Sequence, residues 1–375
     1  MFSIDRLIAV LLKEFVQMRR DRLTFAMMLG MPLMQLVLFG YAINLDPKGL
    51  PAAVVTAESS AFSRSLTRAL ENTGYFKVVA TPPTVEEAER LLVLGDVQFI
   101  LQVPEDFSRR VQRGDNAVVL MEADATDPAA TSNALAALQQ VSLTGLNHDL
   151  TGSLSALQGG PAPFEIRVHR NYNPEGITQY NSVPGLRGVV LTMTMIMMTS
   201  IAMTRERERG TMENLLATPV RPLEVMLGKI VPYIAVGYVQ VFVILLAAKF
   251  LFDVPMLGSL TLLAAVLVVY IAALLAIGFT FSTLARNQMQ AMQMTMFFFL
   301  PSMLLSGFMF PFRGMPDWAQ YLGQLLPLTH FLRIVRGIML KGGAFADIAS
   351  SVWPLAVILV VVSAIALKRY QRTLD

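Results

Sequence analysis

The densest run of ionisable side chains lies between two strongly apolar stretches, in the segment TRERERGTMENLLATPVRP, residues 204–222. Guanidinium and carboxylate groups alternate from Arg205 to Arg209, and Gly210, a short apolar helix pattern and two prolines follow. Such a segment suits docking onto a partner protein, because its apolar side chains can be buried in the interface while the charged side chains fix how the two surfaces align. The alternative is a surface loop that only sets the orientation of the chain in a membrane.

A short helix is predicted inside this segment. Thr211 can cap it and Pro219 ends it, and its apolar side chains then need a covering surface. Pro222 can begin the helix that follows. The candidate docking residues are Glu206, Arg207, Glu208, Arg209, Gly210, Thr211, Met212, Glu213, Leu215, Leu216 and Pro219.

Motifs for covalent or metal chemistry are missing from the sequence. It contains no G-x-x-x-x-G-K-[ST] or G-x-G-x-x-G phosphate loop, no H-E-x-x-H and no G-x-S-x-G. The three histidines are scattered, and the chain has no cysteine that could form a disulfide or a thiolate metal site. We therefore expect no catalytic residue, no metal and no cofactor bound by this chain.

The elements that would position the charged segment are membrane spans. Of 375 residues, 54% are hydrophobic and 15% are charged, a composition too apolar for a soluble protein. Runs of about twenty residues with almost no charge predict transmembrane helices. Six such runs lie at 24–43, 183–204, 230–252, 259–284, 289–312 and 352–367.

Basic residues predict the orientation. With six spans, the basic groups before the first, after the second, after the fourth and after the sixth share one side, which should be the cytoplasm together with both termini. The net charge of +3 and the pI of about 9.1 reflect this clustering, so we expect no nucleic-acid partner. Arg313, Arg333, Arg336 and Lys341 fall on the other side and need a separate explanation.

Residues 45–174 contain short apolar runs that alternate with helical patterns, unlike the long apolar runs of the predicted spans. LPAAVVTA, YFKVVA, VQFILQV, AVVLMEA and FEIRVHR predict strands, with helical patterns between them, the first capped by Ser60 or Ser63 and ended by Gly74. This alternation predicts an α/β domain between the first and second spans, outside the cytoplasm. A longer helix is predicted from leucines at three- and four-residue spacing, Leu143, Leu146, Leu150, Leu154 and Leu157.

The remaining helical patterns bear on transport. Residues 1–23 predict an amphipathic helix along the inner membrane surface. The predicted spans contain no acidic residue, although carriers driven by protons or ions usually need one, so energy would come from another chain. Arg187 and Lys249 lie near span ends, where their side chains can reach the interface. Methionines crowd the second and fifth spans, either as core packing or as a lining for hydrophobic cargo.

The segment RERERGTMENLLATPVRPLEVMLGK resembles the signature of ABC-2 type exporter permeases, and LPLTHFLRIVRGIMLKGG, residues 326–343, is similar to the second hallmark of that family. The resemblance covers residues 183–375 closely and the first helix and span more loosely. The large domain after the first span is similar to the bacterial drug-exporter-like branch. The resemblance implies a six-span α-helical membrane protein whose cytoplasmic helix, residues 211–218, couples to a separate ATP-binding cassette ATPase that uses ATP and Mg.

The resemblance also implies short re-entrant helices in the outer leaflet over residues 313–347. Arg333 and Arg336, three residues apart, would share a helix face there. They would contact anionic lipid or substrate headgroups, or pair with Asp317 or Asp347.

The predicted function is that of a permease subunit of an ATP-driven exporter in a bacterial inner membrane, moving hydrophobic or amphiphilic, drug-like compounds outward in multidrug efflux. Expected partners are the ATPase, a second permease copy or a sister permease, membrane lipids and a periplasmic adaptor protein. Two alternatives stay open. One is export of lipids or lipid-linked glycans, and the other is a membrane sensor or assembly protein that transports nothing.

Overall fold

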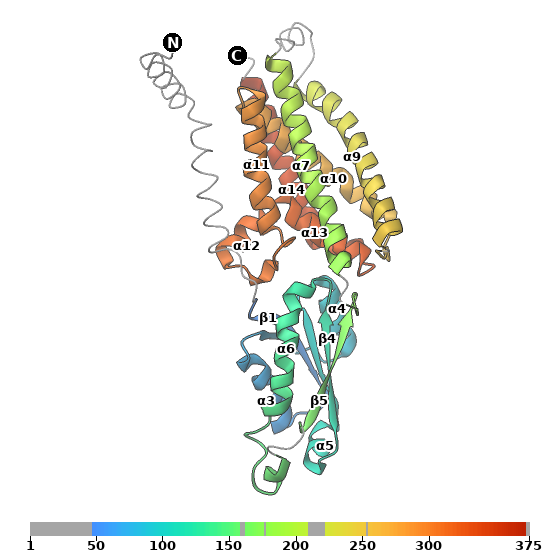
Figure 1. Ribbon diagram of the computed structural model, residues 1–375, viewed down its shortest axis with the longest axis vertical. Coiled ribbons are helices and arrows are strands. Elements are labelled where there is room, and N and C mark those ends of the chain that lie inside the picture. The colour runs from blue at the N-terminus through green and yellow to red at the C-terminus, as the bar shows by residue number, and fades with distance from the viewer. Residues whose placement is uncertain (1–46, 158–161, 176–177, 209–221, 253, 373–375) are drawn as a thin grey trace, which may run out of the picture.

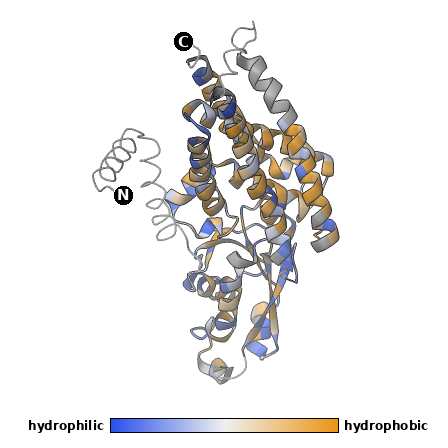
Figure 2. Cartoon of the chain, turned by 45° about the horizontal axis from the view of Figure 1, so that its top comes forward, coloured by the Kyte–Doolittle hydropathy of each residue, from blue (hydrophilic) through white to orange (hydrophobic). Residues whose placement is uncertain are grey.

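The computed structural model describes residues 47–157, 162–175, 178–208, 222–252 and 254–372, and it has two regions, an α/β domain and a bundle of long helices (Figure 1). The predicted amphipathic helix at 1–23 and the predicted first span at 24–43 lie outside the described residues. Hydrophobic residues cover most of the helices, whereas hydrophilic residues gather on the α/β domain (Figure 2).

The α/β domain is built on a five-stranded sheet in the order β2-β1-β3-β4-β5. All neighbouring strands are parallel except β3 and β4, which are antiparallel with Phe99 opposite Ala123. The predicted strands are therefore confirmed. They are β1 (Leu50–Thr56), β2 (Phe76–Ala80), β3 (Phe99–Val103), β4 (Ala117–Asp124) and β5 (Phe164–Asn171).

Both faces of this sheet are covered. Side chains alternate along β1, so that Ala52 and Val54 enter the core under α3, α5 and α6, whereas Ala53 and Val55 pack against α4. Ser60 caps α3, because its hydroxyl accepts a hydrogen bond from the Ser63 backbone N–H at 3.0 Å. The helices are α3 (Ala61–Asn72), α4 (Val85–Leu94), α5 (Phe107–Arg113) and α6 (Pro128–Thr144).

The prediction of one long leucine-patterned helix here is wrong. Helix α6 ends at Thr144, and a separate 3-10 helix, η2, covers Gly152–Leu157. The chain turns after α6, and Gly152, with a φ of 63°, begins η2, so the leucine spacing continues past the end of the helix. Leu146 and Leu150 are nevertheless buried in the sheet core, because the spacing reflected burial and not the path of the backbone.

The second region contains five long helices in the described part of the chain, α7 (Thr178–Glu208), α9 (Pro222–Phe252), α10 (Leu260–Leu284), α11 (Gln288–Leu305) and α14 (Phe345–Arg372). Among the residues that the structure describes, three segments are long and apolar enough to cross a membrane, Ser182–Arg205, Leu260–Leu284 and Phe345–Arg369. They coincide with the predicted second, fourth and sixth spans. Helix α9 covers the predicted third span, and the count of six spans stays a prediction.

The predicted fifth span, 289–312, is wrong at its C-terminal end. Helix α11 has 18 residues and stops at Leu305. Gly307 follows with a φ of 85°, which a continuing helix cannot accommodate. At about 1.5 Å per residue, α11 is roughly 27 Å long, slightly less than the apolar thickness of a bilayer. The chain then forms η3 (Phe312–Gly314), α12 (Asp317–Gln324) and α13 (Pro327–Met339) before α14 begins.

Helix α10 lies at the centre of the bundle and packs on α7 and α14. The Tyr270 hydroxyl donates a hydrogen bond to the Gly188 carbonyl of α7 at 2.9 Å and lies 2.6 Å from the Thr192 hydroxyl. The Tyr270 ring also stacks on Phe331 of α13, with ring centroids 4.0 Å apart. At Gly278 the backbones of α10 and α7 approach so closely that an added Cβ would lie 2.7 Å from the Ile196 carbonyl oxygen.

Candidate functional site

The predicted docking segment begins at one end of the bundle, opposite the α/β domain. Helix α7 starts beside β5 and runs the length of the bundle, and its last residues are Glu206, Arg207 and Glu208 (Figure 1). The other candidates lie outside the described residues. They are Arg209, Gly210, Thr211, Met212, Glu213, Leu215, Leu216 and Pro219.

Glu208 joins the end of α7 to the start of α11. Its carboxylate accepts a hydrogen bond from the Gln288 backbone N–H at 2.8 Å and a second from the Gln288 side-chain amide. These hydrogen bonds lower the pKa of Glu208. Because Asn287 caps α11 by accepting a hydrogen bond from the Gln290 N–H at 2.9 Å, the contact falls on a fixed helix terminus. Sequence patterns gave no signal for Gln288, since its role depends on a contact with a residue 80 positions away.

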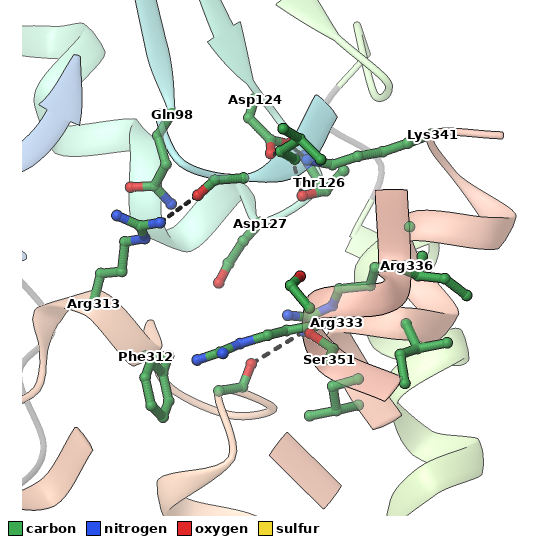
Figure 3. Close-up of a pocket in the computed structure, with 18 of the residues that line it drawn as sticks. Gln98, Asp124, Thr126, Asp127, Phe312, Arg313, Arg333, Arg336, Lys341 and Ser351 are labelled. Atoms are coloured by element: carbon green, nitrogen blue, oxygen red, sulfur yellow. Dashed lines mark hydrogen bonds and ion pairs between the residues drawn. The ribbon is translucent and has the colours of Figure 1, made fainter. Parts of the chain in front are cut away.

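At the opposite end of the bundle, a cavity of about 490 Å³ separates the helices from the α/β domain. The domain contributes the end of α4, the residue before β3 and the end of β4. The helices contribute the segment after α11 together with α12, α13 and the first turns of α14. Figure 3 shows charged side chains from both regions pointing into this space.

Three arginines line the bundle side of this cavity, and neutral groups hold each of them. Arg313 donates a hydrogen bond to the carbonyl of Gly95, the residue that caps α4. Arg336 donates one to the Gly307 carbonyl at 3.1 Å. Arg333 lies over the Phe312 ring, 4.6 Å from its centroid. In the part of the chain that the structure describes, none of the three forms an ion pair with a carboxylate.

A buried ion pair connects the two regions across the same cavity. Lys341, in the short turn between α13 and α14, lies 2.6 Å from Asp124 at the end of β4, and both side chains are only 9% exposed. Lys341 also donates a hydrogen bond to the Leu92 carbonyl at 3.0 Å and lies over the Tyr172 ring. Thr126 donates two further hydrogen bonds to Asp124, from its N–H at 3.0 Å and its hydroxyl at 2.7 Å.

The prediction that Arg333 and Arg336 share a helix is confirmed, because both lie on α13 and line the cavity. Among described residues, the suggested ion pairs with Asp317 or Asp347 do not form. The Asp347 carboxylate instead accepts a hydrogen bond from the Ala344 N–H at 2.8 Å, at the start of α14. Contact with lipid or substrate headgroups stays a prediction.

The prediction that the Arg187 side chain reaches the membrane interface is wrong. Its side chain is 2% exposed and does not reach an interface. Its guanidinium contacts the Met339 sulfur at 2.9 Å, and its Nε and Nη2 have no hydrogen-bond partner among the described residues. The helix pattern placed Arg187 near the end of a span, but α13 packs over that end and covers it.

The described residues contain no group of three or more His, Asp or Glu side chains that could hold a metal ion. His330 lies on α13, and its Nε2 is hydrogen-bonded to the Gln324 carbonyl at 2.7 Å.

Comparison with known proteins identifies relatives over almost the whole chain. A family model described as "ABC-2 family transporter protein" matches residues 22–368. The chain is 28% identical over 369 residues to "Probable multidrug ABC transporter permease YbhR" of Escherichia coli (strain K12), covering 98% of each chain. It is 27% identical to "Probable multidrug ABC transporter permease YbhS" of the same organism, over 90% of this chain and 89% of that protein. It is 25% identical to "ABC transporter G family member 20" of Dictyostelium discoideum, over 89% of this chain and 46% of that protein.

Proposed function

Because this chain belongs to the ABC-2 family of transporter proteins, whose model matches residues 22–368, we propose that it is the permease subunit of an exporter driven by a separate ATP-binding cassette ATPase. The relatives over nearly its full length are named as ABC transporter permeases. The chain itself has no phosphate-binding loop, so the proposal assigns ATP and Mg to the partner ATPase.

The observation that carries this proposal is the arrangement of the bundle. One end presents the charged segment that begins at Glu206, and the Glu208–Gln288 hydrogen bonds connect that segment to two helices. An ATPase docked there would move α7 and α11 together. The other end carries the cavity and the α/β domain, so a displacement of α7 reaches the surface where cargo would leave.

The sequence and the apolar surface of the bundle support proposals about the membrane location, the cargo and the partners. We propose an inner-membrane location with cytoplasmic termini, and hydrophobic or amphiphilic cargo such as the drugs that the names of YbhR and YbhS indicate for those proteins. Helix α9 exposes Val239, Phe242 and Phe250, and α14 exposes Val360. These side chains would face lipid, or a second permease copy or sister chain related by a two-fold axis. A periplasmic adaptor would contact the α/β domain.

The test measures ATPase retention and transport in one preparation. The tagged chain is expressed with its partner ATPase and reconstituted into liposomes, and ATP-dependent movement of a fluorescent amphiphilic dye is measured. Leu216→Asp should release most of the ATPase and abolish dye movement, because buried apolar anchors carry more interface energy than rim charges. Arg207→Gln is the matched control and should have a smaller effect on both. Retention and transport at wild-type levels in Leu216→Asp would refute the docking role of this segment.

A further inference from the structure

The cavity between the α/β domain and the bundle brings three guanidinium groups together from two separate segments. Arg313 comes from η3, and Arg333 and Arg336 come from neighbouring turns of α13. In Figure 3, Arg333 extends beside Phe312 into the space that Arg313 borders from the other side. The Arg336 Nε is buried and has no hydrogen-bond partner among the described residues. Donors are therefore left over for a ligand.

Carboxylates also line this cavity, so the arrangement of its charges decides which ligand it can hold. Four acidic residues, Asp96, Asp124, Asp127 and Asp347, face the three arginines and Lys341. Asp124 is engaged by Lys341 at 2.6 Å, and Asp347 accepts the hydrogen bond at the start of α14. A hydrogen bond from a neutral N–H does not compensate the Asp347 carboxylate, so four carboxylates stand against four cationic side chains in the cavity lining. The placement of these charges, and not their sum, therefore decides where an anion can bind.

Among the three arginines, Arg333 is the one whose charged neighbour is another guanidinium and not a carboxylate. Arg313 lies near Asp96 and Asp124, and Arg336 lies near Asp127 and Asp124. For Arg333, partial desolvation in the cavity and the neighbouring Arg313 guanidinium both lower its pKa. An anion seated between Arg313 and Arg333 would relieve this repulsion. Phosphate fits this position, because the planar guanidinium fork donates two parallel hydrogen bonds to phosphate oxygens, and a tetrahedral group has further oxygens for a second arginine.

Helix α12 supplies an apolar surface next to this anion site. Gln320 and Gln324 are one helical turn apart and line the cavity. Tyr321 and Leu325, each one residue further along, are 71% and 70% exposed. A polar row faces the arginines while an apolar row lies directly beside it. This juxtaposition suits a molecule with an anionic head and a hydrocarbon tail and does not suit a free ion.

We propose that this cavity binds the phosphate headgroup of an amphiphile, with Arg313, Arg333 and Arg336 contacting the phosphate and the Tyr321–Leu325 row of α12 covering the start of the hydrocarbon chain. The α/β domain is the second wall of the site, because Gly95 holds Arg313 in place. As an assignment of substrate class, the site rests on the proposed permease function. The binding itself requires neither ATP nor transport.

The test uses the full chain, purified without the ATPase in a neutral maltoside detergent, and measures dissociation constants by native mass spectrometry. The probes are dihexanoylphosphatidic acid, the uncharged dihexanoylglycerol with the same chains, and inorganic phosphate. Dihexanoylphosphatidic acid should bind at least about tenfold more tightly than either of the other two. Arg333→Gln should weaken its binding by about tenfold or more, as expected for the loss of a charge-assisted hydrogen bond.

Two further variants separate this effect from changes in folding or net charge. Arg167→Gln removes one positive charge from an exposed ion pair on β5 and should leave binding unchanged. Asp96→Asn removes a carboxylate from the cavity and should strengthen binding. The proposal is overturned if inorganic phosphate or dihexanoylglycerol binds as tightly as the phosphatidic acid, or if Arg333→Gln binds it like the wild type. Because no ATP is present, an export defect cannot produce either result.

Discussion

Replacing Lys341 by methionine should loosen the junction between the α/β domain and the helix bundle. The substitution keeps the length of the side chain and removes its ammonium group, which lies 2.6 Å from Asp124 and 3.0 Å from the Leu92 carbonyl oxygen. Both members of the ion pair are 9% exposed, so the Asp124 carboxylate would stay buried without its cation. Stranding one partner of a buried pair typically costs about 3–5 kcal/mol.

Two contacts reduce that cost here. Asp124 keeps the hydrogen bonds from the Thr126 N–H and hydroxyl, at 3.0 and 2.7 Å, and these partly solvate the carboxylate. We therefore expect a loss of about 2–3 kcal/mol in the free energy of opening the junction. A loss of this size raises the opening equilibrium constant roughly 30- to 150-fold, because about 1.36 kcal/mol corresponds to a factor of ten.

Amide hydrogen exchange measures this opening directly. The Ala125 N–H, bonded to the Asn171 carbonyl at 3.2 Å, and the Leu340 N–H, bonded to the Arg336 carbonyl at 2.9 Å, report on the two sides of the junction. Both should exchange faster by the predicted factor in Lys341→Met, whereas amides in the centre of β1 should not change. The double variant Lys341→Met with Asp124→Leu should recover most of the protection, since it leaves no buried charge.

The matched control is Arg167→Met, which breaks an exposed ion pair whose side chains are 63% and 45% exposed. Pairs of this kind contribute about 0–1 kcal/mol, so exchange at the junction should not respond. If Lys341→Met accelerated exchange of Ala125 and Leu340 no more than Arg167→Met does, the ion pair would not hold the junction together.

Three other predictions concern packing, titration and orientation. Gly278→Ala should lower the thermal midpoint by an amount equivalent to about 1–3 kcal/mol, because its Cβ would meet the Ile196 carbonyl oxygen. Gly237→Ala is the control and should cost less, because its Cβ would meet only the side chain of Ile271. Equal midpoints for the two variants would contradict this. Burial and the carboxylates of Asp124, Glu122 and Glu89 raise the pKa of Tyr172 to about 12. The free energy of unfolding should therefore fall between about pH 10 and 12, because the phenol ionises more readily in the unfolded state. Tyr172→Phe should reduce this pH dependence, measured by chemical denaturation. In intact cells, an impermeant thiol reagent should label Ser59→Cys, at an exposed position before α3, and spare Thr211→Cys; the reverse pattern would invert the proposed orientation.

Local sequence patterns predicted the strands and the helix cap of the α/β domain, because these depend on residues close together in the chain. The strands of the α/β domain were predicted as short apolar runs rich in Val and Ile, and each of them is present. Ser60 or Ser63 was predicted as a cap because a hydroxyl before a helix can satisfy a free N–H, and Ser60 is the residue that does so. The leucine spacing after Thr144 predicted that Leu146 and Leu150 are buried but not that the helix ends at Thr144.

The candidate sites were harder to predict, because they depend on contacts between distant segments. Arg333 and Arg336 could be paired from their spacing on one helix. Their neighbour Arg313 could not, because it is held by a carbonyl 218 residues away. Lys341 and Asp124 are 217 residues apart, and nothing in the local sequence of either indicates the other. Arg187 was misjudged for the same reason, since the helix that buries it comes much later in the chain.

The Tyr270 contacts have a mechanical consequence. One side chain of α10 is hydrogen-bonded to the backbone of α7 and stacked on Phe331 of α13. Sliding α7 along α10 by even one residue, about 1.5 Å, would break that hydrogen bond and drive the Ile196 carbonyl against the close contact at Gly278. The three helices α7, α10 and α13 therefore resist sliding past one another and would move as one rigid body. A displacement of α7 at Glu208 would therefore tilt the three helices together and would move the arginines of α13 at the far end of the bundle.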